Sequence, residues 1–277
     1  MSPQSTFGSI EAERGLRALF TSFSALVGET RLLIKGSGDP VLSAIRPLLF
    51  SITDSGRSLE LLASKRQLRD GFVISRTIFE TALNVCFITV GAEPVAARAQ
   101  QHALQKWWRG LEKQMELVRN EAGRDLSATP PLRPSADMQQ AVDQFTSNRG
   151  RELTSWTPEN VPERLNFIAE RLGGESVASL RTALVAIYRL ASEVAHGTLY
   201  GAYFAAGSTK LKDAPQTPAQ FEQFYRESFC MLFLVLVGAL HDLLNIISSR
   251  RPLTEILTRA EALLAEMRQT QWLSTGD

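Results

Sequence analysis

The chain has 277 residues, of which 44% are hydrophobic and 21% charged, and its 30 basic and 29 acidic residues leave a formal net charge of +1 at pH 7. A chain of this length can bury a sizeable core, and the composition is that of an ordinary globular protein. The near-zero net charge argues against a protein that coats DNA, so any contact with nucleic acid would have to be local.

Composition and apolar patterning also indicate the compartment. Cys86 and Cys230 both lie in apolar runs, which predicts reduced core residues rather than a disulfide framework. The first residues contain no basic region followed by an apolar stretch, so we expect no signal peptide. The most apolar segment, residues 229–240, would span roughly 18 Å as a helix, well short of the ~30 Å core of a bilayer. We therefore expect a soluble cytoplasmic protein that does not enter a membrane.

Apolar residues recur at spacings of three and four almost throughout, and alternating β-branched runs are missing, which predicts an all-α protein. In chain order, we expect helices over about residues 10–35, 41–63, 68–90, 94–121, 136–146, 163–172, 177–195, 218–247 and 253–271. The prolines of segment 123–135 predict a loop, and the glycines of 196–218 predict a loop or a broken helix. The pattern favours an antiparallel helical bundle in one domain, residues 1–277, with an irregular excursion at 122–160.

Several motifs of metal and nucleotide chemistry are missing from the sequence. It contains no GxxxxGK[ST] phosphate loop, no strand-linked GxGxxG, no CxxC and no HExxH. The three histidines, His102, His196 and His241, do not share a short segment, as zinc ligands usually do. We therefore expect no metal site and no cofactor.

One helix carries four polar side chains in a single stripe, within the sequence YRLASEVAHG. Arg189, Ser192, Glu193 and His196 stand at positions i, i+3, i+4 and i+7, and seven residues make about two turns of a helix. Arginine offers a fixed fork of donors to phosphate oxygens, and histidine carries a proton near neutral pH. The stripe could therefore act on a phosphodiester. The alternative is an ordinary helix end, at which Gly197 is the C′ residue and the histidine complements the helix dipole.

A second polar stripe runs through the otherwise apolar segment 68–90, where Arg76, Glu80 and Asn84 stand at i, i+4 and i+8. A charged pair among so many apolar neighbours is hard to leave in solvent, and buried charges need partners. Arg189, Glu193 or His196 from the other helix would be natural partners. The alternative, which does not exclude the first, is an ion pair that fixes how two helices cross.

The two stripes together resemble the HEPN superfamily. The stretch RLASEVAH fits its Arg-x(4–6)-His pattern. An uncharacterised branch of the superfamily has an early element similar to SRTIFETALNV (75–85) and a late one similar to YRLASEVAHG (188–197), preceded by a segment that WTPENVPERLNFIAERLG (156–173) resembles. The resemblance covers roughly residues 50–200. It implies a HEPN-like core at roughly 40–250 with additional N- and C-terminal helices.

Many HEPN proteins are metal-independent ribonucleases that work as dimers with their two motifs face to face. The resemblance therefore implies an RNA endonuclease, in which His196 transfers a proton as the RNA 2′-hydroxyl attacks the adjacent phosphate and Arg189 stabilises the transition state. Ser192 and Glu193 would orient the imidazole or the substrate. One departure is Leu190, because active members often have a polar residue directly after the arginine.

The resemblance also implies supporting residues and partners. Arg76 and Glu80, with Asn84 and Tyr188, would form the layer that holds the motif helix. The implied partners are RNA, a second copy of the chain and an antitoxin protein, in a defence or toxin–antitoxin setting.

Two other functions are compatible with the sequence. The first is a non-catalytic dimeric adaptor in which the Arg/Glu/His cluster is a structural network. The second is a bundle that binds a small ligand or nucleotide near the polar cluster, using Trp107, Trp108 and Arg109. Adjacent tryptophans can stack bases, but burial in the core is the more ordinary fate of such a pair, and we expect both to be buried.

Overall fold

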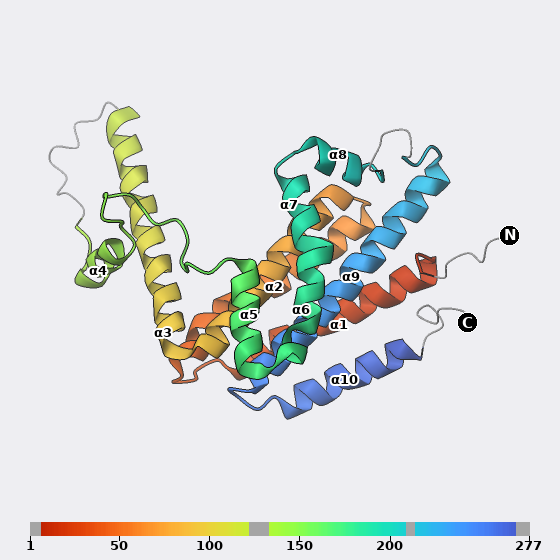
Figure 1. Ribbon diagram of the computed structural model, residues 1–277, viewed down its shortest axis with the longest axis horizontal. Helices are drawn as coiled ribbons and strands as arrows, with labels where there is room; N and C mark the ends of the chain where they lie inside the picture. Colours follow the sequence, from red (N-terminus) through yellow and green to blue (C-terminus); the bar gives the residue numbers. More distant parts are fainter. Residues whose placement is uncertain (1–6, 122–132, 209–213, 270–277) are drawn as a thin grey trace.

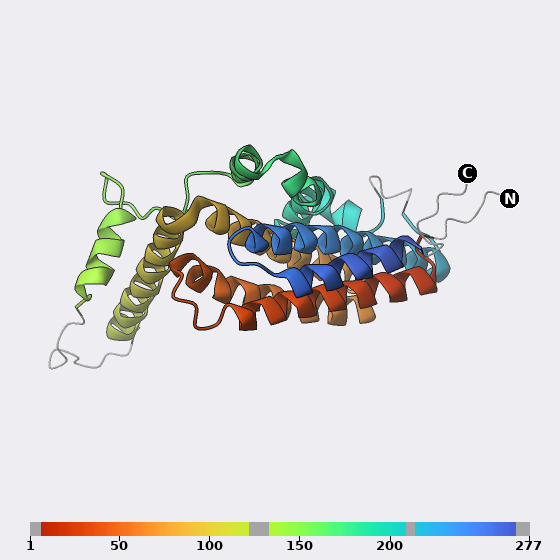
Figure 2. The same cartoon turned by 90° about the horizontal axis from the view of Figure 1, so that it is seen from below.

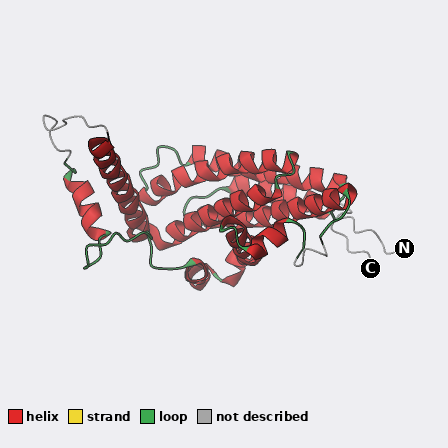
Figure 3. Cartoon of the chain, turned by 90° about the horizontal axis from the view of Figure 1, so that it is seen from above, coloured by secondary structure: helices red, strands yellow, loops and turns green. Residues whose placement is uncertain are grey.

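Helices form the framework of this computed structural model, which describes residues 7–121, 133–208 and 214–269 (Figures 1 and 3). In chain order they are α1 (Ile10–Leu33), α2 (Pro40–Ser64), α3 (Leu68–Glu121), α4 (Ala136–Gln144), α5 (Val161–Leu172), α6 (Ala178–Ala183), α7 (Arg189–Ala195), α8 (Leu199–Ala205), α9 (Pro218–Ser248) and α10 (Thr254–Arg268). A 3-10 turn, Gly174–Val177, precedes α6, and a π-helical segment, Leu184–Tyr188, joins α6 to α7. The described ranges contain no strand, only an isolated bridge between Thr146 and Glu152, so the predicted all-α bundle is confirmed.

Helix starts follow the local sequence closely. The Asp39 side chain accepts hydrogen bonds from the first backbone N–H groups of α2, and Pro40 occupies its first turn. Asn160 and Thr217 each form a reciprocal capping box with the Glu or Gln three residues later, at the starts of α5 and α9. These caps satisfy backbone donors that have no partner within their own helix. These three helices start within two residues of the predicted positions.

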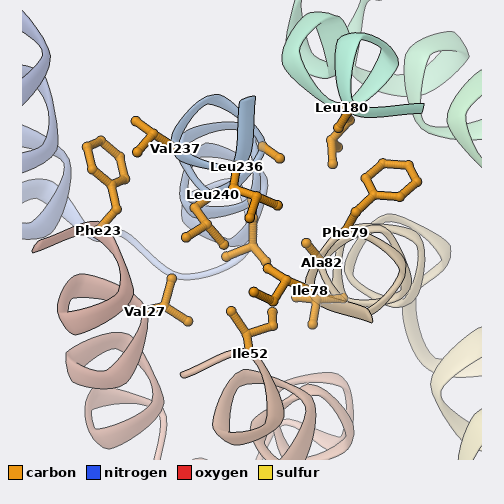
Figure 4. Close-up of a cluster of buried hydrophobic side chains, with 14 of the residues drawn as sticks. Phe23, Val27, Ile52, Ile78, Phe79, Ala82, Leu180, Leu236, Val237 and Leu240 are labelled. Atoms are coloured by element: carbon orange, nitrogen blue, oxygen red, sulfur yellow. The ribbon is translucent and has the colours of Figure 1, made fainter. Parts of the chain in front are cut away.

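The core lies where α1, α2, the first half of α3 and α9 pack together, with α6 covering one side (Figure 4). Phe23 of α1, Ile52 of α2, Phe79 of α3 and Leu240 of α9 all point into it and are essentially inaccessible to solvent. Cys86 and Cys230 are free and buried, as predicted. Burial of these side chains is the main term that stabilises such a bundle.

By length and composition alone, α3 and α9 could each cross a membrane. Of the most apolar window in each, 56% in α3 and 67% in α9 is buried inside the bundle, which is what a core helix of a soluble protein also shows. The apolar segment 229–240 lies within α9, where most of its residues are buried.

A kink divides α3 into a half that belongs to the bundle and an arm that leaves it (Figures 1 and 2). Ala92 has φ 57° and ψ −152°, a conformation that glycine tolerates best, and Pro94 cannot continue a regular helix. Gly91 also has no room for a side chain, because a Cβ there would lie 2.3 Å from Val95. The predicted break between residues 90 and 94 is thereby confirmed. The arm packs against α4.

Helix α9 fixes the start of the segment that carries the YRLASEVAHG motif. The Leu180 backbone N–H donates to Asp242 Oδ2 at 2.9 Å, and a Cβ on Gly238 would lie 2.9 Å from Ser179. Burial raises the pKa of Asp242, an effect that the hydrogen bonds from Leu180 and Ser179 oppose. From this anchor the chain runs through α6 and the π-helical segment into α7. The predicted helix 177–195 is thus present, with one turn wound more loosely than an α-helix.

The segment 196–218 contains a short helix, α8, between turns, in agreement with the expectation of a loop or broken helix. Most of the loop expected at 123–135 lies outside the described residues. The rest of the 122–160 excursion contains α4 and an irregular stretch that leads to α5.

Candidate functional site

The polar stripe of the motif lies on the face of α7 that points away from the core. Ala191 and Val194 are buried on the opposite face. Arg189 and His196 are exposed, and Ser192 between them is half-buried. We call Arg189, Ser192 and His196 the outer motif face. Neither Arg189 nor His196 makes a side-chain hydrogen bond or ion pair with another described residue, so both are free to meet a ligand or a second protein.

The end of α7 also has the geometry of the helix end that was the alternative interpretation. His196 is the C-cap, and Gly197 follows with φ 63°. The N–H of Gly197 donates to the Val194 carbonyl at 3.2 Å, and the N–H of Thr198 donates to the Glu193 carbonyl at 3.2 Å. These two bonds make a Schellman motif. The two interpretations are therefore compatible, because the helix end itself carries the imidazole outward.

Glu193 has a structural contact that the sequence pattern did not indicate. Its carboxylate accepts a hydrogen bond from Thr198 Oγ1 at 2.8 Å, and the same hydroxyl accepts from the Gly201 N–H at 3.0 Å, which caps α8. A Cβ on Gly201 would lie 2.4 Å from the Glu193 carbonyl oxygen, so α8 packs directly on the α7 backbone. The carboxylate thus bonds the corner between α7 and α8, rather than the imidazole of His196.

The second stripe meets the motif helix through Tyr188. Arg76 contacts Glu80 Oε1 through Nε and Nη2, each at 3.1 Å, and its guanidinium carbon lies 4.7 Å from the centre of the Tyr188 ring. The Phe79 ring packs edge-on against the same tyrosine, with 6.0 Å between ring centres. The stripes therefore do come together, but the contact differs from the expected one. Stacking on Tyr188 takes the place of a bond to Arg189, Glu193 or His196.

Arg164 of α5 completes this cluster, and sequence reasoning missed it. Its Nη1 donates to Asn84 Oδ1, while its buried Nε has no hydrogen-bond partner. Burial lowers the pKa of the Arg164 guanidinium, and the charge of Glu80 opposes that effect. Its signal in the sequence is weak, since it is one arginine of a short amphipathic helix, beside the buried Leu165.

We call the five residues that join α3, α5 and the start of α7 the inner polar cluster: Arg76, Glu80, Asn84, Arg164 and Tyr188. Tyr188 belongs to the inner polar cluster and Arg189, the next residue, belongs to the outer motif face. A change in how these helices pack would therefore move the outer motif face directly.

The tryptophan pair lies elsewhere, in the arm beyond the kink of α3 (Figure 1). Trp108 is buried, as expected, whereas Trp107 is 57% exposed, so the expectation of two buried tryptophans was wrong for Trp107. Arg109 Nη2 donates to Thr146 Oγ1 at 2.6 Å and ties the arm to the end of α4. These residues do not join the inner polar cluster, which lies in the half of α3 before the kink.

Among the described residues, no group of three or more His, Cys, Asp or Glu side chains is placed to hold a metal ion. His241 bonds Glu261 of α10 at 2.7 Å, and His102 packs against Phe145 in the arm with 4.9 Å between ring centres. The three histidines therefore lie in separate parts of the structure.

The fold and the paired polar groups define an all-α bundle with an exposed Arg/His face next to a half-buried polar cluster. A family described as "Family of unknown function (DUF5677)" matches residues 42–210, more than half of the chain and both polar stripes. The chain belongs to this family. No curated protein and no solved structure matches it.

Proposed function

We propose that this protein is a HEPN-type, metal-independent RNA endonuclease that acts as a homodimer. The observation that carries the proposal is the joint exposure of Arg189 and His196 on the outer motif face, without described partners that would occupy them. If the two side chains belonged to a buried structural network, they would be bonded within the fold. Support also comes from the inner polar cluster, which holds the helix directly before this face.

The chemistry follows from the two side chains. His196 would accept the proton of an RNA 2′-hydroxyl as that oxygen attacks the adjacent phosphorus. The bond from phosphorus to the 5′-oxygen would break, and the leaving 5′-oxygen would take a proton from water or from the protonated imidazole, leaving a 2′,3′-cyclic phosphate on one fragment and a 5′-hydroxyl on the other. Arg189 would stabilise the charge that develops on the phosphate oxygens. Ser192, half-buried between them, would help to orient the substrate or the imidazole.

A second copy of the chain fits the surroundings of the outer motif face. Val185, just before Arg189, is 68% exposed, and Leu199 and Tyr200, just after His196, are 68% and 46% exposed. Exposed large apolar side chains next to polar groups are typical of surfaces that a protein partner covers. A two-fold contact here would place two Arg/His pairs opposite each other. In a defence or toxin–antitoxin setting in the cytoplasm, an antitoxin protein would act by covering the same surface.

One observation favours the alternative, a non-catalytic dimeric adaptor. Glu193, assigned a catalytic role by the resemblance, bonds Thr198 and fixes the α7–α8 corner. Leu190 stands where active HEPN nucleases often have a polar residue. In an adaptor the outer motif face would bind a partner without any reaction, and the dimer would form without RNA cleavage.

The decisive experiment incubates a mixed RNA pool with the wild-type protein, His196→Ala and the control Arg181→Ala, all in the presence of EDTA. Arg181 is also exposed, on α6, outside the outer motif face. We expect fragments with cyclic phosphate ends from the wild type and from Arg181→Ala. We expect at least ~100-fold less product from His196→Ala, because a general base contributes about 10²–10⁴ in rate.

The same variants separate loss of chemistry from loss of structure. His196 is exposed, so its replacement should change the free energy of unfolding by no more than about 0.5 kcal/mol. Equal cleavage by the wild type and His196→Ala would refute the proposal, and so would a wild-type protein that cleaves no RNA. A dimer without cleavage would leave the adaptor as the better account.

A further inference from the structure

A cavity of about 580 Å³ lies at the elbow where the arm leaves the bundle. We call it the elbow cavity. Its walls come from both halves of α3, with Phe87 before the kink and Arg98 and Gln101 after it, from α4, and from the segment that leads into α5. The volume is within the range of small-molecule sites. None of its residues belongs to the outer motif face or the inner polar cluster.

One side of the elbow cavity is aromatic. The ring of Phe87 packs against Trp156 and Phe167, with 5.8 Å and 4.8 Å between ring centres. Arg98 holds this wall in place, because its Nε donates to the Trp156 carbonyl at 2.8 Å. Its guanidinium also lies over the Phe145 ring, 5.2 Å from the centre. Phe87 is itself buried, and the Arg171 guanidinium covers the Phe167 ring at 3.4 Å from its centre. Trp156, which is half-buried, is therefore the ring of this wall on which a flat heterocycle could stack.

The other side carries three carboxamides, Gln101 from α3 and Gln140 and Gln144 from α4. None of the three amide groups makes a hydrogen bond with a described residue, and Gln101 Oε1 is buried without a partner. A buried carbonyl that lacks a donor destabilises the folded protein. A ligand that brings an N–H group to Gln101 would remove this penalty.

We propose that the elbow cavity binds a nucleobase. A nucleobase is a flat heterocycle with adjacent donors and acceptors on its edge, and side-chain carboxamides pair with such edges through two hydrogen bonds. Aromatic side chains bind its face by stacking. The base could belong to a free nucleoside or to an unpaired position of a single strand. This site is independent of the proposed cleavage at His196.

The test measures binding by calorimetry for the wild-type protein, Gln101→Leu and Gln114→Leu. Gln114 is an exposed glutamine of the same arm that does not line the elbow cavity. The probes are the four ribonucleosides and short 2′-deoxy oligonucleotides, which carry the same bases but no 2′-hydroxyl and so cannot be cleaved by the proposed reaction. We expect saturable binding of at least one nucleoside, weakened about 3–10-fold by Gln101→Leu, as for one lost hydrogen bond. Gln114→Leu should bind as the wild type does.

Thermal unfolding distinguishes a ligand-binding role of Gln101 from a structural one, because the two roles predict opposite changes in the melting temperature of Gln101→Leu. Because Gln101→Leu replaces an unpartnered buried amide by an apolar side chain, its melting temperature without ligand should equal or exceed that of the wild type. Weaker binding together with a lower melting temperature would show that the amide serves the fold, and would overturn the proposal. So would equal affinities of Gln101→Leu and the wild type, or no binding of any nucleoside or oligonucleotide. Binding to oligonucleotides alone would identify the strand as the source of the base.

Discussion

At the residue scale, Asp39 has two roles that can be separated by substitution. Its carboxylate caps α2 by accepting from the N–H groups of Val41 and Leu42, at 2.8 and 3.3 Å. It also pairs with Arg250 after α9, at 2.6 and 3.0 Å, which joins two helices far apart in the sequence. The hydrogen bond from Arg250 lowers the pKa of the Asp39 carboxyl, and the backbone donors of α2 lower it further.

Asp39→Asn should keep the cap and lose the charge pair, whereas Asp39→Ala should lose both. At pH 7 we expect Asp39→Asn to reduce the free energy of unfolding by about 1 kcal/mol. Asp39→Ala should cost about 1 kcal/mol more, the usual cost of a lost N-cap. Urea unfolding of the three proteins measures both steps, and equal losses would show that the cap contributes nothing.

The same pair gives a pH dependence of known sign. Because the folded-state pKa of Asp39 is lowered, the pair stabilises the protein above the unfolded-state value of about 3.9. That contribution is lost as the pH falls through the folded-state pKa. The stability difference between wild type and Asp39→Asn should therefore be constant from pH 5 to 7 and shrink in stronger acid. A difference that grows in acid would contradict this assignment.

The sequence identified individual polar residues of the two stripes where they recur at helical spacing. Arg76, Glu80, Arg189 and His196 stood out because their positions repeat at helical intervals. Arg164 did not, because its partner Asn84 lies 80 residues away and no local pattern connects them. A contact between distant helices depends on how they pack, which periodicity does not encode.

At the element scale, the corner between α7 and α8 depends on the close approach that Gly201 allows. A Cβ at Gly201 would lie 2.4 Å from a backbone carbonyl, which cannot rotate away as a side chain could. Gly201→Ala should therefore push α8 off α7 and reduce the free energy of unfolding by about 1–3 kcal/mol. Chemical denaturation is the measurement.

Gly110 in the arm provides the matched control. It is also helical, but a Cβ there meets no atom within 4 Å. Gly110→Ala should stabilise the protein by up to about 1 kcal/mol, because alanine favours the helix. Equal effects of the two substitutions would show that the α7–α8 contact is looser than described.

Most helices, and the break in α3, followed from apolar spacing, prolines and caps. The π-helical turn at Leu184–Tyr188 did not, because it changes the winding without interrupting the apolar pattern. The turn matters for the site, since an extra residue in the winding rotates α7, which carries Arg189, relative to α6.

At the scale of the whole molecule, the proposed homodimer makes a prediction about assembly. Leu199→Glu places a charge on an exposed apolar position, at the first turn of α8, where an acidic side chain suits the helix dipole. The fold should therefore persist, while light scattering after size exclusion should shift from dimer to monomer and RNA cleavage should fall with it. Leu61→Glu on α2, at a position that is 61% exposed, is the control and should remain dimeric. A Leu199→Glu protein that is still dimeric would place the interface elsewhere.

At this scale the sequence predicted the fold class, but it did not predict that an arm projects from the bundle. Helical periodicity indicated a bundle, but the projecting arm depends on the backbone angles of one residue, Ala92. The elbow cavity depends on the arm in turn, because its walls come from segments on both sides of the bend. No stretch of sequence read alone indicated that Phe87 and Gln101 would face a common space.

The bend in α3 also bears on what binding would cost. Pro94 excludes a straight helix, and Ala92 persists in a conformation unfavourable for alanine because its surroundings over-determine it. The bend therefore fixes the position of the aromatic wall relative to the carboxamides of the elbow cavity before any ligand binds. A nucleobase would enter a preorganised site, and little of its binding free energy would be spent on ordering the arm.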